Sequence, residues 1–193
     1  WVLDVPMFLV KRGKDVYRNT GQTFRSYMDD GFEGLTPTME DWEIHLNTLF
    51  PEARLKNTLE VRGADGQTQA RLCALPALWK GLLYDPKAMD AADDLTAPWS
   101  LASVEAVRPH IATQALHAEM DGRPILEHAQ ALVEIADAGL ERLGNLDGAG
   151  NDERVHLRPL RQLLDAGECP ADPLLRDVGD SPSVEALVEH ASA

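Results

Sequence analysis

The stretch Arg54-Leu55-Lys56-Asn57-Thr58-Leu59-Glu60-Val61-Arg62 constrains both the fold and the chemistry of this chain. Successive side chains of a β-strand point to opposite faces of a sheet. A strand over this stretch has Arg54, Lys56, Thr58, Glu60 and Arg62 on one face, and Leu55, Leu59 and Val61, with Asn57, on the other. Unpaired buried charges cost several kcal/mol each. We therefore expect the apolar face to pack and the charged face to meet water, a metal ion or an anionic ligand.

The acidic composition makes this row of cations unusual. The 193 residues carry a formal net charge of -14, with a pI near 4.7. Nucleic-acid-binding proteins generally present a basic stripe, so this balance argues against that class and against anionic membrane surfaces. No apolar run approaches the roughly 20 residues that span a bilayer. The two cysteines, Cys73 and Cys169, lie in no metal-binding motif, which favours a reducing, cytoplasmic location.

The first part of the chain, residues 1–85, is predicted to mix strands and helices. We expect a strand over 1–10, a turn over 12–15 and a short return strand over 16–18, followed by an irregular loop over 19–38. Thr38 and Asp41 have the spacing of a capping box, which predicts a helix that ends before Pro51. The charged strand follows, then a turn over 63–66 and an apolar helix over 70–83.

The second part, residues 86–193, is predicted to be helical. Ser100 has the character of an N-cap residue. Pro124 fits the first turn of a helix, where its missing N–H is harmless, and an apolar stripe continues from there to a stop near Gly144. Further helices are expected over 152–166 and 183–190. The fold class is therefore α/β (α+β), with helix exceeding strand and domains at 1–85 and 86–193.

From the residue pattern alone, two interpretations of the charged strand stay open. The charges can face solvent or protect a sheet edge from pairing. Alternatively, Glu60 binds a cation and Arg62 binds phosphate, because Mg²⁺ prefers carboxylate oxygens and the planar guanidinium matches phosphate oxygens. The six histidines lack metal-binding spacing, and the sequence has no glycine-rich phosphate loop.

A collinear series of motifs carries a family resemblance. It comprises Asp41-Trp42-Glu43, His45-Leu46, Thr48-Leu49-Phe50-Pro51-Glu52, Arg54-Leu55-Lys56, Leu59-Glu60-Val61-Arg62-Gly63-Ala64-Asp65, Leu72-Cys73-Ala74-Leu75-Pro76-Ala77-Leu78-Trp79 and Gly81-Leu82-Leu83-Tyr84-Asp85. Together with Leu3-Asp4-Val5-Pro6-Met7, Thr20-Gly21 and Thr23-Phe24-Arg25, the series resembles glutamate–cysteine ligase of the plant and proteobacterial type. The resemblance is dense over residues 1–85 and weaker beyond. It covers only the C-terminal portion of the longer family enzyme.

The resemblance implies a glutamine-synthetase-like fold and an ATP-dependent ligase. Such an enzyme phosphorylates the γ-carboxylate of L-glutamate, and the amine of L-cysteine then attacks the acyl phosphate in the first step of glutathione biosynthesis. ATP and Mg²⁺ are the implied cofactors. Glu60 is then the Mg²⁺ ligand and Arg62 the catalytic phosphate contact. Arg54 and Lys56, on the same face, are expected to bind nucleotide or substrate by holding other phosphate oxygens, or to hold neighbouring metal-ligand carboxylates. By the resemblance, Trp1 lies near the amino-acid substrate.

Departures from the family pattern leave alternatives. Plant members form a redox clasp between two cysteines, but Asn19 stands at the first of those positions and residues 20–38 contain no cysteine. Cys73 is expected to be a buried, reduced thiol. The competing hypotheses are a ligase with another acceptor amine and a non-catalytic module. We expect the 193 residues to be inactive alone, as a truncation or processed piece, and a homo-oligomer stays open.

Overall fold

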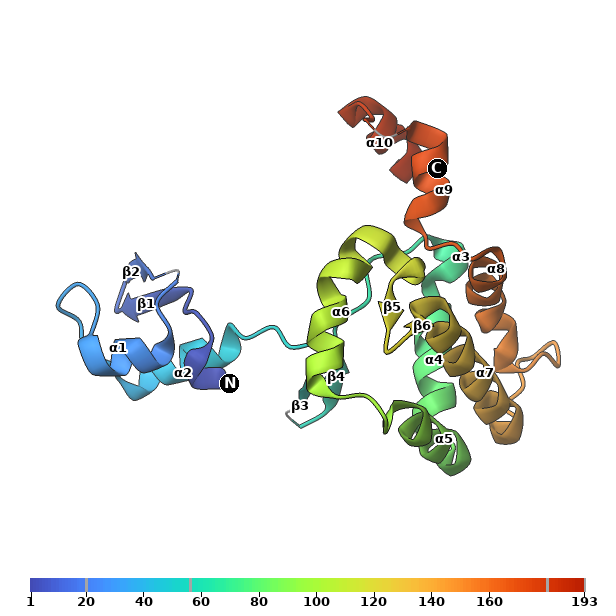
Figure 1. Cartoon of the computed structure of the whole chain (residues 1–193), viewed down its shortest axis with the longest axis horizontal. Helices are drawn as coiled ribbons and strands as arrows, with labels where there is room; N and C mark the ends of the chain where they lie inside the picture. The colour runs from blue at the N-terminus through green and yellow to red at the C-terminus, as the bar shows by residue number, and fades with distance from the viewer. Residues whose placement is uncertain (20, 56, 180, 193) are drawn as a thin grey trace. The chain divides into compact units, whose positions relative to one another are not determined.

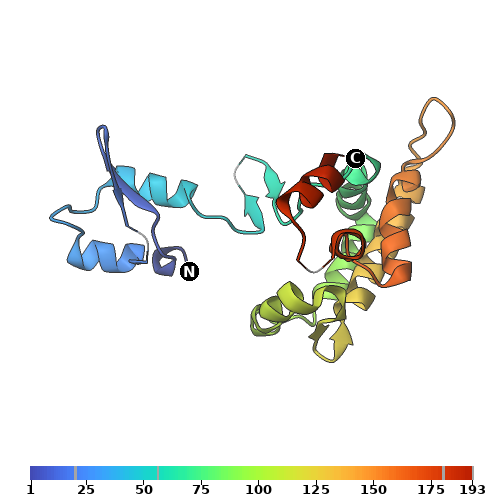
Figure 2. The ribbon, with the colours of Figure 1, turned by 90° about the horizontal axis from the view of Figure 1, so that it is seen from above.

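A computed structural model describes residues 1–19, 21–55, 57–179 and 181–192 of the chain (Figures 1 and 2). Internal contacts divide the chain into two compact units, Trp1–Asp65 and Gly66–Ala193. The sequence predicts a different kind of boundary near residue 86, between a catalytic portion and a helical region. That functional boundary stays a prediction. Each unit is described by itself.

The first unit combines short strands with short helices. Its elements are η1 (Val2–Asp4), β1 (Leu9–Arg12), β2 (Asp15–Arg18), α1 (Phe24–Asp30), α2 (Met39–Asn47), β3 (Ala53–Leu55) and β4 (Leu59–Val61). The pair β1–β2 is an antiparallel hairpin in which Arg12 faces Asp15. Gly13 occupies the turn with φ of 60°, a conformation that glycine adopts without steric cost. The predicted turn and return strand are confirmed.

Two expectations for the first 38 residues are wrong. The sequence predicts one strand over 1–10, but the structure divides this segment. It contains the 3₁₀ turn η1, an isolated bridge between Pro6 and Thr23, and the start of β1. The loop predicted over 19–38 contains α1, whose N-cap residue Thr23 accepts a hydrogen bond from the Ser26 amide. Tertiary packing explains this helix, because Phe24 and Tyr27 join Met7 and Val10 in the core of the unit.

The capping box at the start of α2 is confirmed. The Thr38 side chain accepts from the Asp41 amide, and the Asp41 carboxylate accepts from the Thr38 amide. These two bonds satisfy donors that the first turn of any helix leaves unpaired. His45 of α2 and Leu49, which follows the helix, are buried, whereas Leu46 is exposed.

The second unit is mostly helical. Its elements are α3 (Gln69–Leu72), α4 (Ala74–Leu83), α5 (Pro86–Thr96), α6 (Leu101–Gln114), η2 (Ala115–His117), β5 (Glu119–Met120), β6 (Arg123–Pro124), α7 (Ile125–Leu143), η3 (Glu153–Leu157), α8 (Arg158–Ala166), α9 (Ala171–Val178) and α10 (Val184–Ser192). The Ser100 cap, the start of α7 after Pro124 and its end at Gly144 are confirmed. The helix predicted over 152–166 is divided into η3 and α8.

Helices α4 and α7 pack side by side at the centre of the second unit (Figure 1). Their contact is unusually close, because Gly81 of α4 and Gly139 of α7 allow the two backbones to approach. Ala77, Leu82, Ala136, Leu140 and Leu157 form the buried cluster around it. The apolar helix predicted over 70–83 is interrupted at Cys73. Pro76 therefore lies in the first turn of α4, where no intrahelical N–H bond is lost.

Helix exceeds strand over the described residues, as the sequence predicts. The strands there form three separate two-stranded antiparallel sheets, with no larger sheet. Cys73 is exposed, so the expectation of a buried thiol is wrong for this chain. Among the described helices, none is both long and apolar enough to cross a bilayer.

Candidate functional site

The predicted charged strand is a hairpin. β3 and β4 pair antiparallel with Arg54 opposite Glu60, and the chain reverses between them. The single strand predicted over 54–62 is therefore wrong. Polar Asn57 and Thr58 lie in the bend between the strands, and asparagine favours such reversals because its side chain can bond to its own backbone. The reversal keeps Arg54 and Glu60 on one face, since directly opposed residues of a hairpin share a face.

Glu60 is the centre of the charged face. Arg54 donates through Nε and Nη2 to Oε2 of Glu60, at 2.9 and 2.6 Å. The Nε atom of Arg62 lies 3.8 Å from the other carboxylate oxygen, Oε1, which is an ion pair beyond hydrogen-bond distance. The Glu60 side chain is 45% exposed. The structure thus brings together Arg54, Glu60 and Arg62, as predicted, although across a hairpin.

Arg62 has a different environment from Arg54. Its guanidinium carbon lies 5.0 Å from the centroid of the Phe50 ring, in a cation–π contact. Its backbone amide donates to the carbonyl oxygen of Glu52 at 2.8 Å. Its Nη1 atom is buried, and no hydrogen-bond acceptor for it is found among the described residues. Arg62 therefore retains donors for a ligand, whereas Arg54 uses two of its donors on Glu60.

Among the described residues on the apolar face of the hairpin, Leu55 and Leu59 are exposed and Val61 is half-buried. Leu55 is 79% exposed and Leu59 is 55% exposed, which contradicts the expectation of a packed face. Trp1 is also exposed, at 73%, and its carbonyl oxygen accepts from the amides of Asp4 and Val5 within its own turn. In the part of the chain that the structure describes, the hydrogen bonds, ion pairs and cation–π contact of Glu60 and Arg62 do not include Trp1. The prediction for Lys56 falls outside the described residues.

The metal ion predicted at Glu60 stays a prediction. Glu60 offers a carboxylate whose Oε1 atom is within hydrogen-bond distance of neither arginine. Mg²⁺ takes six oxygen ligands, some of them water or phosphate. Over the described ranges, no group of three or more acidic, histidine or cysteine side chains is placed to hold a metal ion. Among the described residues, Glu60 offers one carboxylate oxygen that could serve as a single ligand of such an ion.

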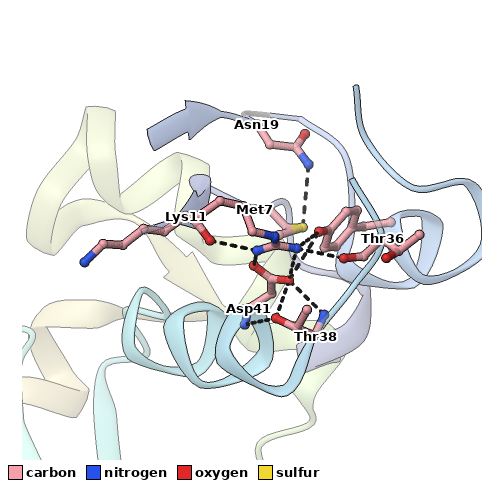
Figure 3. A network of polar contacts seen from close by, with 8 residues as sticks. Met7, Lys11, Asn19, Thr36, Thr38 and Asp41 are labelled. Atoms are coloured by element: carbon pink, nitrogen blue, oxygen red, sulfur yellow. Dashed lines mark hydrogen bonds and ion pairs between the residues drawn. The ribbon is translucent and has the colours of Figure 1, made fainter. Parts of the chain in front are cut away.

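A second polar network holds the first unit together (Figure 3). Arg12 donates to both carboxylate oxygens of Asp41, at 2.6 and 2.8 Å, and also to the Tyr27 hydroxyl and the Thr36 carbonyl oxygen. The Asp41 side chain has no exposed area. Burial by itself raises the pKa of Asp41, but the hydrogen bonds from Arg12 and Thr38 outweigh it and hold that pKa below 3.8.

Sequence reasoning found only half of this network. The spacing of Thr38 and Asp41 revealed the cap, but nothing local indicates that Arg12 reaches a residue 29 positions later. Both Nη atoms of Arg12 and both carboxylate oxygens of Asp41 form hydrogen bonds within the chain, so the network ties β1, α1 and α2 together. Phe50 belongs to the motif Thr48-Leu49-Phe50-Pro51-Glu52, but no local pattern indicates its contact with Arg62, which the structure shows.

Comparisons with known proteins agree with these motifs. A family model described as glutamate-cysteine ligase family 2 (GCS2) matches residues 1–190. The chain is 41% identical over 180 residues to the chloroplastic glutamate–cysteine ligase of Medicago truncatula, with 91% of this chain and 34% of the relative covered. It is 38% identical over 178 residues to glutamate–cysteine ligase A, chloroplastic, of Oryza sativa subsp. indica. That match covers 91% of this chain and 35% of the relative.

A family match that spans residues 1–190 shows the family of this chain. The chain belongs to glutamate-cysteine ligase family 2. The Arabidopsis thaliana chloroplastic glutamate–cysteine ligase is 41% identical over 180 residues, and the match covers 91% of this chain and 33% of that protein. The chain thus spans about a third of the length of the curated relatives that it matches.

Proposed function

We propose that this chain is the C-terminal portion of an ATP-dependent glutamate–cysteine ligase. The whole protein joins the γ-carboxylate of L-glutamate to the amine of L-cysteine through a γ-glutamyl phosphate. The observation that carries the proposal is the family match over residues 1–190, which includes the hairpin with Arg54, Glu60 and Arg62 on one face. The 193 residues alone are expected to be inactive.

The hairpin chemistry suits phosphoryl transfer. Making an acyl phosphate from ATP concentrates negative charge on the transferred group, and cations placed beforehand lower the barrier to that step. In this proposal Arg62 donates to the transferring phosphoryl group through the edge of its guanidinium. Glu60 is a ligand of Mg²⁺, which when bound neutralises phosphate charge. Arg54 orients the Glu60 carboxylate through its two hydrogen bonds, and this contact supports an orienting role better than direct phosphate binding.

Substitutions in the full-length protein test the assignment. With ATP, Mg²⁺, glutamate and cysteine supplied, we expect Arg62→Ala and Glu60→Gln to lower ADP release by roughly 100-fold or more, the scale on which loss of a preorganised charged contact acts. Arg123→Ala and Glu127→Gln are matched controls, because these residues form an exposed ion pair on the second unit. Wild-type rates in Arg62→Ala and Glu60→Gln would show that the assigned roles are wrong.

The acceptor amine separates the proposal from its nearest alternative. A glutamate–cysteine ligase releases ADP and forms a dipeptide only when cysteine is supplied with glutamate and ATP. Replacing cysteine with other amino acids at the same concentration tests this requirement. Product with another amine, and none with cysteine, would favour a ligase of different acceptor specificity. ADP release by the isolated 193-residue chain would contradict its expected inactivity.

The cellular location is a separate proposal. We propose a cytoplasmic protein, on the basis of the two unpaired cysteines, whereas the relatives compared above are named as chloroplastic. Fractionation of the source cells, with detection of the full-length protein by antibody, tests this location. Recovery in an organelle fraction would overturn it.

A further inference from the structure

We propose that Phe50 is a positioning residue for Arg62, setting the plane of the guanidinium so that its N–H edge is free to meet phosphate. The proposal rests on the function proposed above. It assigns to Phe50 the task of orienting a side chain that contacts the transferred group.

The exposure of Phe50 indicates that the ring has a task other than core packing. It is 64% exposed, and it lies outside the buried cluster of the first unit. Phe50 stands between α2, which ends at Asn47, and the start of β3 at Ala53. Because Pro51 follows, steric contact with the proline ring restricts the Phe50 backbone to extended conformations. Phe50 therefore lies in a short, conformationally restricted segment that leads directly into β3.

The Phe50 ring also contacts a second aromatic residue. Phe8 contacts it edge to face, with ring centroids 5.9 Å apart and planes at 80°. Aromatic pairs prefer this arrangement, because the positive edge of one ring meets the negative face of the other. The carbonyl oxygen of Phe8 accepts from the Asn19 amide at 3.1 Å, which fixes the backbone that carries Phe8. Arg62 therefore rests on a ring that is itself held in place.

The cation–π contact suits a phosphate-binding arginine. The guanidinium carbon of Arg62 lies 5.0 Å from the centroid of the Phe50 ring, and a cation–π contact needs no hydrogen-bond acceptor, so Phe50 accepts no hydrogen bond from the guanidinium N–H groups in the way that a carboxylate would. Glu60 approaches Nε only to 3.8 Å, and Nη1 is buried without an acceptor among the described residues. A carboxylate partner in place of Phe50 would instead occupy those donors, as Glu60 occupies two of Arg54.

Kinetics of the full-length protein provide the first test. We expect Phe50→Leu to lower kcat for ADP release roughly tenfold, with a smaller change in the KM for glutamate. A tenfold loss in rate corresponds to the free energy of a partly desolvated cation–π contact. Phe50→Tyr keeps the ring face and should retain most of the activity. Tyr84→Leu is the control, because Tyr84 is 72% exposed and lies on the second unit.

A double-mutant cycle distinguishes positioning from a general structural effect. If Phe50 acts through Arg62, Phe50→Leu has no further effect on kcat in an Arg62→Ala background. An equal loss in both backgrounds overturns the proposal. Full activity of Arg62→Ala also overturns it, because there is then no catalytic arginine to position.

Side-chain NMR of the 193-residue chain tests the contact without any enzyme assay. A proton near the face of a ring is shifted upfield by the ring current. We expect the Arg62 side-chain resonances to be shifted upfield in the wild type and in Phe50→Tyr, and to lose that shift in Phe50→Leu. Unshifted Arg62 resonances in the wild type overturn the inference. This measurement needs no activity, so it separates the two proposals. Shifted Arg62 resonances together with full activity of Arg62→Ala would contradict the proposed function but not the contact, whereas unshifted resonances would contradict the contact.

Discussion

Gly81 of α4 and Gly139 of α7 stand opposite each other where the two helices cross. A Cβ atom added at Gly81 would overlap the carbonyl oxygen of Ala136, and one added at Gly139 would overlap the carbonyl oxygen of Gly81. Backbone atoms cannot yield as the end of a flexible side chain can. The helix pair at the centre of the second unit therefore depends on the absence of two side chains.

Gly81→Ala is expected to lower the free energy of unfolding by about 2 kcal/mol or more, because overpacking of a tight contact costs that much. Urea denaturation of the 193-residue chain, followed by far-UV circular dichroism, measures the change. Gly148→Ala is the matched control, since a Cβ at Gly148 meets no atom within 4 Å. Equal midpoints for the two variants would show that the helices tolerate a wider separation.

Asp41→Asn is expected to destabilise the first unit by about 3 kcal/mol at pH 7, since it breaks an ion pair whose carboxylate is buried. Burial raises the pKa of Asp41, but hydrogen bonds from Arg12 and Thr38 lower it further, so the folded pKa lies below the ordinary aspartate value. The stabilisation from its charge is therefore fully present above pH 3.8 and is lost as pH falls through the lower folded value. The difference in unfolding free energy between wild type and variant should shrink below about pH 4. A difference that is constant from pH 7 to pH 3 would contradict this account.

Asp85 combines two stabilising contacts in the second unit. Its Oδ1 atom accepts from the Ala88 amide at the start of α5 and from Nε and Nη2 of Arg142, at 2.8, 2.9 and 2.7 Å. Asparagine retains a cap acceptor but no charge, and alanine retains neither. We expect Asp85→Ala to cost about 1 kcal/mol more than Asp85→Asn in thermal or urea unfolding. Equal losses would mean that the ion pair alone matters at this position.

His128 is buried on α7, and among the described residues neither ring nitrogen has a hydrogen-bond partner. Its ring meets Trp99 edge to face at 5.2 Å. An unsatisfied buried polar group costs free energy, so His128→Leu is expected to raise the free energy of unfolding by about 1 kcal/mol. The exposed His156→Leu should change it by less than about 0.5 kcal/mol. Destabilisation of His128→Leu beyond that of the control would indicate that the ring has a polar partner in solution.

Local sequence signals predicted the helix ends and one turn. Thr38 with Asp41, Ser100 and the Pro124-to-Gly144 span each mark a helix boundary within a few residues, because capping satisfies donors and acceptors of a single turn. The same locality explains the failures. Helix α1 has only seven residues, a length at which an isolated helix is marginal, and it exists because Phe24 and Tyr27 pack in a core built from distant residues.

The sequence by itself determined the family, the helix caps and the residue types of the charged stretch. It also placed Arg54, Glu60 and Arg62 on one face, although by assuming one strand where the chain forms a hairpin. Only the tertiary structure decided which arginine holds Glu60 and which one rests on Phe50. It also decided that Arg12 pairs with Asp41 and that two glycines join α4 to α7. These contacts join residues far apart in the chain, and their partners are fixed by chain reversals and packing that no short pattern encodes.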